Sequence, residues 1–158
     1  MSQNRILGLD LANKAGICVL DYEKNLLYSD SIVLAVKDPQ KRILNLRKLL
    51  CEVVSKYHPS EFAVEDVFLP AKTSRKTPIS LGELRGVARL SAAESNVPIY
   101  FYAPKKVKMA ITGNGNASKE DVLHWITSEL NFEPKDDNEA DAVSIAYTHL
   151  LMKPYTLE

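Results

Sequence analysis

Hydrophobic and polar positions alternate along the first 34 residues of the chain. The segment 5–12 (RILGLDLA) places its leucines on one side and isoleucine, glycine and Asp10 on the other, which is the period of a half-buried strand. Two more segments of strand character, 16–22 and 26–34, follow after short polar connections. Three strands in succession with tight turns predict an antiparallel meander.

From Asp38 onward the apolar spacing changes to three and four residues, the period of an amphipathic helix. Asp38 can cap this helix, Pro39 suits its first position, and Pro59 ends it. Patterning and breaker residues then predict a buried strand at 61–68, a basic loop at 69–78, a helix with small residues at 79–96, a strand at 97–103, a short helix at 104–111, a helix at 119–130 begun by Ser118, and a last helix at 137–152.

Together these elements predict an α/β fold, in which an antiparallel meander and parallel strands form one mixed five-stranded sheet flanked by helices. The 158 residues suffice for one domain, which we expect to span 1–153 with a frayed tail at 154–158. No apolar run approaches the roughly 18 residues of a membrane span, and the N-terminus lacks a signal-peptide pattern. We therefore expect a cytoplasmic protein with no membrane partner.

The formal net charge of zero conceals a segregation of charge. Residues 69–119 contain nine Lys or Arg but only two acids, so this segment carries +7 and the rest of the chain −7. A basic band within a neutral protein is typical of a surface that binds a polyanion. Composition by itself fits a set of unrelated solvated lysines equally well.

Two carboxylates interrupt strands whose other residues are mostly apolar. Asp10 lies near the end of the first strand, and Glu65 lies in the strand at 61–68. A buried ionised carboxylate is strongly unfavourable unless it is paired or binds a cation. If the two strands are parallel neighbours, their carboxyl ends meet at the sheet edge where open α/β sheets place their sites. A turn role for Asp10 and an ion pair for Glu65 are the structural alternatives.

A third carboxylate, Asp141, lies beyond the first turn of the last predicted helix, where the apolar core should begin. Helical spacing puts Asp137 and Asn138 on the same face, whereas Asp136 and Glu139 are explained by the helix start and by solubility. If this helix crosses the sheet edge, Asp141 completes a site for a hard cation, Mg²⁺ or Mn²⁺. Such sites commonly hold two ions for phosphodiester hydrolysis.

Five collinear stretches resemble the RuvC family of Holliday-junction resolvases, within the RNase H-like superfamily: ILGLDLA, FAVEDVFLPAKTS, LGELRGVA, VKMAITGNGNASK and EADAVSIAYTH. They stand in the family's order and spacing and cover nearly the whole chain. The resemblance implies an RNase H-like fold and a homodimeric, metal-dependent endonuclease that resolves four-way DNA junctions by paired symmetric nicks near the crossover. It also implies that Asp10, Glu65 and Asp141 bind two Mg²⁺ or Mn²⁺ ions and act in catalysis.

The chain departs from the family at a fourth ligand, which is usually Asp or His three residues before the last one. Asn138 stands there, and its amide oxygen can coordinate a hard cation but adds no charge. Asp137 is the alternative, because a residue four positions before Asp141 shares its helical face. This departure and the short segment after the last helix suggest a phage-type branch of the family, acting in a bacterial or phage-infected cell.

The resemblance also implies roles for the basic segment. Phe68 is similar to an aromatic wedge that stacks on opened bases, with a core position at a strand end as the alternative. Lys108 and Lys119 match the family's catalytic lysines near the scissile phosphate. The small-residue helix at 79–95 matches the family's dimer interface, although it can also pack on its own sheet. The remaining expected DNA contacts are Lys72, Arg75, Lys76, Lys105 and Lys106.

Other functions would share these residues. A related nuclease that acts on forks, flaps or RNA–DNA hybrids would use the same carboxylates, and loss of the fourth ligand would fit a protein that binds junctions without cutting them. The segment LGLDLANKAG is also similar to the first phosphate loop of actin-like ATPases and sugar kinases, which need a second such domain. The three histidines, His149 among them, are expected to be structural or on the surface. Nothing in the sequence identifies a branch-migration motor as a partner.

Overall fold

The computed structural model describes residues 4–34, 37–66 and 76–153, with the side chains of residues 76–78 outside the description. In chain order the elements are β1 (Arg5–Asp10), β2 (Lys14–Asp21), β3 (Leu26–Val33), α1 (Pro39–Tyr57), β4 (Glu61–Glu65), α2 (Lys76–Glu94), β5 (Ile99–Tyr102), α3 (Pro104–Thr112), α4 (Lys119–Leu130) and α5 (Asp137–Met152). The five strands form one sheet in the order β3-β2-β1-β4-β5. β1, β2 and β3 pair antiparallel, whereas β1 with β4 and β4 with β5 pair parallel, which confirms the predicted mixed sheet.

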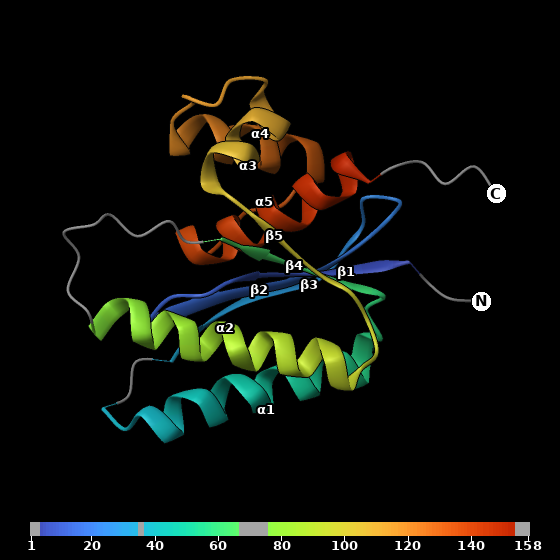
Figure 1. The fold of residues 1–158 in the computed structure, drawn as a ribbon. Helices are drawn as coiled ribbons and strands as arrows, with labels where there is room; N and C mark the ends of the chain where they lie inside the picture. Colours follow the sequence, from blue (N-terminus) through green and yellow to red (C-terminus); the bar gives the residue numbers. More distant parts are fainter. Residues whose placement is uncertain (1–3, 35–36, 67–75, 154–158) are drawn as a thin grey trace.

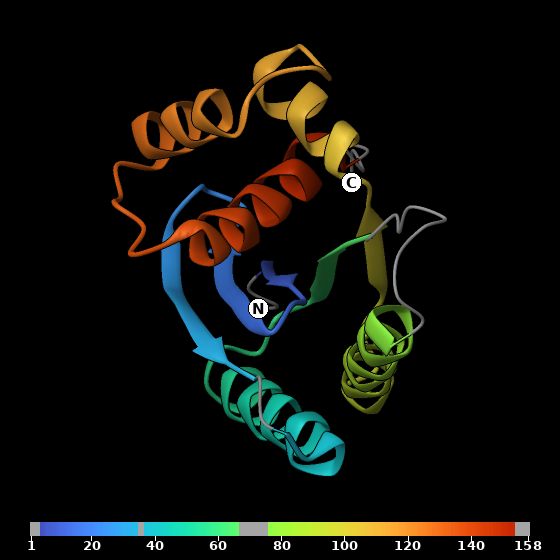
Figure 2. The ribbon, with the colours of Figure 1, turned by 90° about the vertical axis from the view of Figure 1, so that its left-hand side faces the viewer.

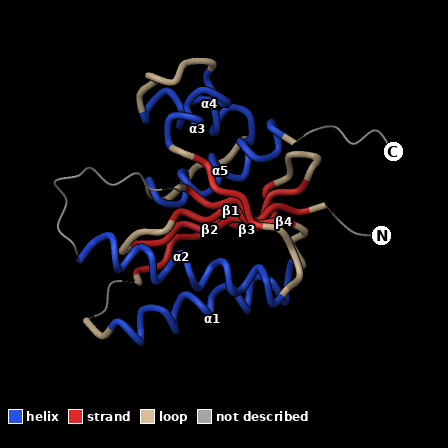
Figure 3. The backbone as a smooth tube through the Cα atoms, viewed as in Figure 1, coloured by secondary structure: helices blue, strands red, loops and turns tan. Residues whose placement is uncertain are grey.

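The sheet separates two layers of helices (Figures 1 and 3). α1 and α2 cover one face, while α5 lies against the other with α3 and α4 beyond it. The alternation along β1 matches these layers: Leu7 and Leu9 belong to the core on the α1 and α2 side, and Ile6 belongs to the core on the α5 side. Because side chains alternate between the two faces of a strand, Asp10 shares the α5 face with Ile6.

α5 packs directly on β1 and β2 (Figure 2). Two glycines permit this close approach: a Cβ at Gly8 would lie 2.4 Å from the Ala142 carbonyl oxygen, and one at Gly16 would lie 1.8 Å from the Asn138 carbonyl oxygen. Gly16 pairs with Asp10 across the sheet. The N-terminal end of α5 therefore lies over the end of β1 that carries Asp10, and the helix runs antiparallel to that strand.

The structure confirms the predicted starts of α1, α4 and α5. Asp38 accepts a hydrogen bond as the cap of α1, and Pro39 opens that helix. Ser118 and Asp121 form a reciprocal capping box at the start of α4. Asp136 caps α5, as expected of an acid at a helix start. None of the helices in the described part of the chain is both long and apolar enough to cross a membrane.

Two predicted boundaries are wrong. β4 ends at Glu65 rather than at residue 68, and α2 begins at Lys76, inside the segment predicted as a loop. The helix can start there because Pro78 stands in its first turn, where a backbone N–H has no intrahelical acceptor to lose. Residues 67–75 lie outside the described part of the chain, and with them the predicted DNA contacts Phe68, Lys72 and Arg75.

Candidate active site

Asp10 and Glu65 lie side by side at the carboxyl ends of two parallel strands. The register pairs Leu9 of β1 with Val64 of β4, so the next residues of the two strands are neighbours, as predicted. Asp10 is 5% exposed and Glu65 is half-buried, and their carboxyl groups share a hydrogen bond. Burial, this hydrogen bond and the negative charges of Glu65 and Asp141 raise the pKa of Asp10 to about 9. Asp10 therefore holds a proton at neutral pH.

Asp141 approaches the same region from α5. Its Oδ2 lies 3.2 Å from Nζ of Lys119, the first residue of α4. Burial raises the pKa of Asp141, while the ammonium group of Lys119 opposes that rise. The charges of Asp141 and Lys119 both act on Asp10, so all three carboxyl groups lie within electrostatic reach of one another. The structure thus brings together the three acids that the sequence singled out.

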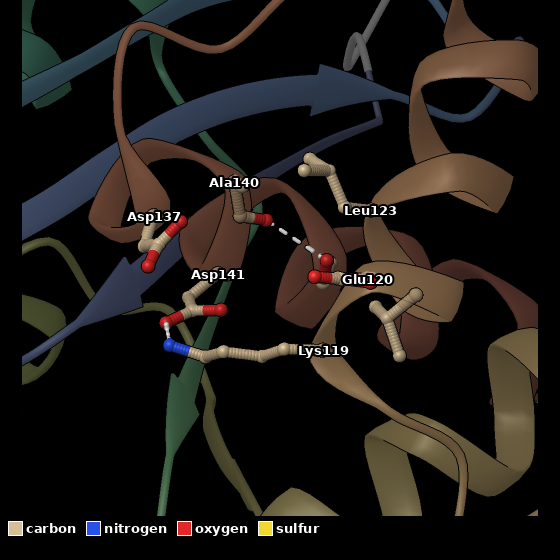
Figure 4. A pocket seen from close by; sticks show the side chains of 8 residues that line it. Lys119, Glu120, Leu123, Asp137, Ala140 and Asp141 are labelled. Carbon is tan, nitrogen blue, oxygen red and sulfur yellow. Dashed lines mark hydrogen bonds and ion pairs between the residues drawn. The ribbon is translucent and has the colours of Figure 1, made fainter.

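A pocket of about 380 Å³ lies between α4 and α5 beside this ion pair. Figure 4 shows the Lys119 side chain extended toward Asp141, with Asp137 one turn earlier on α5. All three residues line the pocket, and Asp137 is exposed. Asn138 is half-buried, is not part of the lining, and has its carbonyl oxygen against Gly16.

The side chains of Asp10, Glu65 and Asp141 are not arranged as a complete metal-binding site. Among the residues that the structure describes, no three His, Cys, Asp or Glu side chains stand close enough to form a ready-made metal site. The proton on Asp10 and the Lys119 ammonium group against Asp141 supply the positive charge instead. Three carboxylates from three elements are nevertheless the oxygen donors that hard divalent ions select. The donor set therefore fits Mg²⁺ or Mn²⁺ in exchange for that proton and that ammonium group.

The lysines with predicted roles lie in different places. Lys119 is ion-paired with a site carboxylate. Lys108 is half-buried on α3 and does not line the pocket, whereas Lys105 and Lys106 are exposed on the same helix. Lys76 begins α2, with its side chain outside the described part of the chain. The structure therefore joins Lys119 to the carboxylates and leaves the other roles as predictions.

Glu139 contradicts the interpretation that it serves solubility. It is 7% exposed, and its carboxylate accepts hydrogen bonds from the Ser29 hydroxyl group on β3 and from the Lys135 N–H. The close packing of α5 on the sheet covers this part of its first turn. Glu139 points toward β3, away from Asp141, as a spacing of two residues on a helix predicts.

Sequence reasoning missed a second carboxylate on β4, Glu61, which is 5% exposed. Its Oε2 lies 2.7 Å from Nε2 of His149, and its Oε1 accepts hydrogen bonds from the Tyr22 hydroxyl and the Lys153 ammonium group. A spacing of four residues places Glu61 and Glu65 on the same face of the strand, which was the available signal. The partners of Glu61 come from distant segments that no local pattern connects.

Comparisons with known proteins agree on one family. Residues 6–149 match the family model described as crossover junction endodeoxyribonuclease RuvC. The protein of that name from Pseudothermotoga lettingae is 39% identical over 117 residues, covering 73% of this chain and 71% of the relative. The one from Caldanaerobacter subterraneus subsp. tengcongensis is 34% identical over 152 residues, covering 92% of this chain and 91% of the relative.

Solved structures resemble the whole fold. Thermus thermophilus RuvC superimposes with a TM-score of 0.84 at 27% identity, covering 93% of each chain. The same protein in complex with a Holliday junction substrate gives 0.86 at 28% identity, covering 94% of this chain and 93% of that one. The yeast mitochondrial Holliday junction resolvase shares the fold, with a TM-score of 0.58 at 18% identity over 94% of this chain and 78% of that one.

Proposed function

This chain belongs to the RuvC family of crossover junction endodeoxyribonucleases, and on that premise we propose that it is the metal-dependent endonuclease that resolves four-way DNA junctions. One observation carries the proposal: Asp10, Glu65 and Asp141 gather at one sheet edge of a chain that matches the family from residue 6 to residue 149. The product is a pair of symmetric nicks near the crossover.

Asp10, Glu65 and Asp141 are the proposed ligands of the divalent metal on which the family depends. The ions are Mg²⁺ or Mn²⁺, two per site, and when bound they supply charge stabilisation at the scissile phosphate and activation of the attacking water. The raised pKa of Asp10 supports this role, because it reflects carboxyl groups crowded together without enough positive charge. Asp10 would release its proton on metal binding, and both Asp10 and Glu65 would hold the ions through their carboxylate oxygens.

Lys119 acts on the phosphate in this proposal. Its ammonium group, now paired with Asp141, turns to the charge that develops on the scissile phosphate during cleavage. Lys108 on the neighbouring helix α3 serves the same charge from a greater distance. Of the two candidates for the fourth ligand, Asp137 is the better supported, because it is exposed and lines the pocket together with Asp141.

The segment that follows β4 is the proposed wedge and clamp for DNA. It starts directly after the strand that carries Glu65, so it leaves the sheet at the site. Phe68 stacks on bases opened at the crossover, and the cationic side chains grip the phosphate backbone without reading sequence. The residues assigned to phosphate contacts are Lys72, Arg75, Lys76, Lys105, Lys106, Lys108 and Lys119.

Paired symmetric nicks require two active sites, and we assign the dimer contact to the outer face of α2. Ile79 and Leu90 are exposed large apolar residues of this helix, 63% and 47% accessible. Gly82 and Gly86 lie between them, and a Cβ at either position would meet no atom of the described residues within 4 Å. Packing within the chain therefore does not require these glycines, whereas a second helix in close contact would.

A junction-cleavage assay tests the proposed function. A synthetic mobile four-way junction is incubated with the protein and Mn²⁺, beside fork, flap and RNA–DNA hybrid substrates of the same sequence. We expect symmetric nicks in the junction and much slower cutting of the other substrates. Asp10→Asn is the matched control, because it keeps the shape of the side chain and removes its charge. Undiminished cutting by this variant would reject the site, and preferential cutting of another substrate would reject the proposed specificity.

A further inference from the structure

Glu61, His149 and Tyr102 form a buried chain of hydrogen bonds across three elements. Glu61 lies on β4, His149 near the end of α5 and Tyr102 on β5, and they are 5%, 3% and 8% exposed. His149 Nε2 lies 2.7 Å from Glu61 Oε2, and its Nδ1 is hydrogen-bonded to the Tyr102 hydroxyl group. The two contacts assign the ring: Nε2–H donates to the carboxylate, and Nδ1 accepts from the hydroxyl group.

The Glu61–His149–Tyr102 hydrogen-bond network reaches the edge of the active site. Tyr102 is the partner of Glu65 in the register between β5 and β4. Its side chain belongs to the core on the α5 side, the face that also carries Glu65. On the helix, His149 and Asp141 are eight residues apart, a rise of about 12 Å. The polar chain therefore links α5 to the two strands beside Glu65, at a point about two helical turns from Asp141.

The contact between α5 and the centre of the sheet does not by itself fix the rotation of the helix, so the Glu61–His149–Tyr102 hydrogen bonds can contribute to it. Small residues meet there, with Ala142 and Ala146 against Gly8 and with Asn138 against Gly16. Such a contact sets how closely the helix approaches the sheet, but small side chains interlock little and restrict rotation about the helix axis weakly. Buried, directional hydrogen bonds restrict that rotation: the bond between Glu139 and Ser29 does so near the start of α5, and the bond between His149 and Glu61 does so near its end.

We propose that His149 is a positioning residue: through Glu61 and Tyr102 it fixes the rotation of α5 and the place of β5, and so sets Asp141 relative to Glu65 for cation binding. This inference rests on the proposed function, in which these two carboxylates bind the metal. His149 itself does not touch the cation or the DNA.

The other partners of Glu61 hold the hydrogen-bond network in place. The Tyr22 hydroxyl and the Lys153 ammonium group both reach Oε1, and this ammonium group lies 3.9 Å from the centroid of the Tyr22 ring. Burial raises the pKa of Tyr102 to about 12, so its hydroxyl group keeps the proton that it donates to His149. A fully satisfied buried network of this kind holds one arrangement.

Metal affinity, rather than activity or stability alone, separates positioning from a structural role. The variants are His149→Gln, which shortens the link, and Tyr102→Phe, which removes one hydroxyl group and leaves no cavity. Tyr147→Phe is the matched control, because it removes from the same helix a hydroxyl group that does not belong to the Glu61–His149–Tyr102 network. Mn²⁺ binding is measured by calorimetry on each folded variant, together with the Mn²⁺ dependence of junction cleavage and junction binding without divalent metal.

We expect His149→Gln to weaken Mn²⁺ binding by about tenfold or more, as loss of a group that orients a ligand does. Tyr102→Phe should weaken it about threefold by the same effect on one bond, while Tyr147→Phe matches the wild type and junction binding is unchanged in all three. If His149→Gln does not fold, Tyr102→Phe decides the question by itself. Mn²⁺ affinities equal to that of Tyr147→Phe would overturn the positioning role. Wild-type protein that binds Mn²⁺ but does not cut junctions would instead refute the proposed substrate, and calorimetry would still test His149.

Discussion

Two carboxylates on the same face of β4 are held in opposite ways. Glu61 receives hydrogen bonds from Tyr22, His149 and Lys153, which come from three different segments. Glu65 is hydrogen-bonded to Asp10, whose pKa is raised to about 9, and the nearby Asp141 has the Lys119 ammonium group as its ion-pair partner. Glu61 is buried and Glu65 is half-buried, but burial alone does not explain the contrast. Among the described residues, the two carboxylates differ in their supply of hydrogen-bond donors.

This difference separates a structural carboxylate from a functional one. A buried carboxylate with enough donors is compensated within the fold and ties elements together. Carboxylates that outnumber their donors repel one another, and they are stable only while they hold a proton or a cation. A divalent ion would therefore stabilise the carboxylates of Asp10 and Glu65, whereas the carboxylate of Glu61 is already compensated by its hydrogen-bond donors.

Glu65→Gln is the change with the largest expected effect. It removes a metal ligand and should lower junction cleavage on the order of 10³-fold, because metal ligation contributes several kcal/mol to the transition state. The same change should raise the thermal unfolding midpoint of the metal-free protein, since it removes a negative charge from beside Asp10. Single-turnover cleavage and thermal unfolding in a chelator measure the two effects. A lower unfolding midpoint of the metal-free variant would contradict the claim that the Glu65 carboxylate destabilises the fold when no metal is bound.

Glu61→Gln tests the other end of β4 and should change stability with the opposite sign. It leaves Lys153 and His149 without their buried counter-charge, and we expect the free energy of unfolding to fall by about 2–3 kcal/mol. The loss stays near the lower end for a broken buried pair, because Lys153 is 28% exposed and solvent screens its charge. Urea denaturation with a chelator measures the difference. A variant as stable as the wild type would show that these donors do not stabilise the fold.

The raised pKa of Asp10 should make the stability of the metal-free protein depend on pH at the active-site end. The pKa of Asp10 is about 9 in the folded protein against the ordinary 3.8, so the folded state holds a proton that the unfolded chain has released. Stability without metal is therefore highest below pH 3.8 as far as Asp10 is concerned, and it declines as the pH rises toward 9. The raised pKa of Asp141 adds a slope of the same sign.

Thermal unfolding of the metal-free protein at pH 5, 7 and 9 measures this slope, with Asp10→Asn as the control that should flatten it. Added Mn²⁺ should raise the midpoint most at high pH, because the ion and the proton compete for the same oxygens. A midpoint that does not depend on pH in the wild type, or an equal slope in Asp10→Asn, would show that the carboxyl groups are not crowded as described.

The sequence predicted those parts of the site that depend on local pattern. Alternation along β1 placed Asp10 on the face opposite the leucines, and the parallel pairing of β1 with β4 brought Glu65 beside it. The spacing within α5 separated Asp141 from Glu139 correctly. These features follow from periods of two and 3.6 residues, which any window of the chain contains.

The features that the sequence did not predict depend on contacts between distant segments. His149 was expected to be structural or on the surface, and its burial at 3% exposure agrees with the structural alternative; its partner Glu61, 88 residues away, was not predicted. Glu139 was assigned to solubility because no local pattern shows that β3 covers the first turn of α5. The start of α2 was placed too late because Pro78 indicates a loop and a first helical turn equally well.

The smallest expected effect concerns the fourth ligand. Asp137→Asn should weaken Mn²⁺ binding about tenfold, whereas Asn138→Ala should change it less than about twofold. The reason is position: Asp137 is exposed and lines the pocket with Asp141, while Asn138 is half-buried and meets Gly16 through its backbone, which the substitution keeps. Glu133→Gln is the matched control, because it removes an exposed carboxylate outside the pocket. A larger loss in Asn138→Ala than in Asp137→Asn would assign the fourth place to the amide.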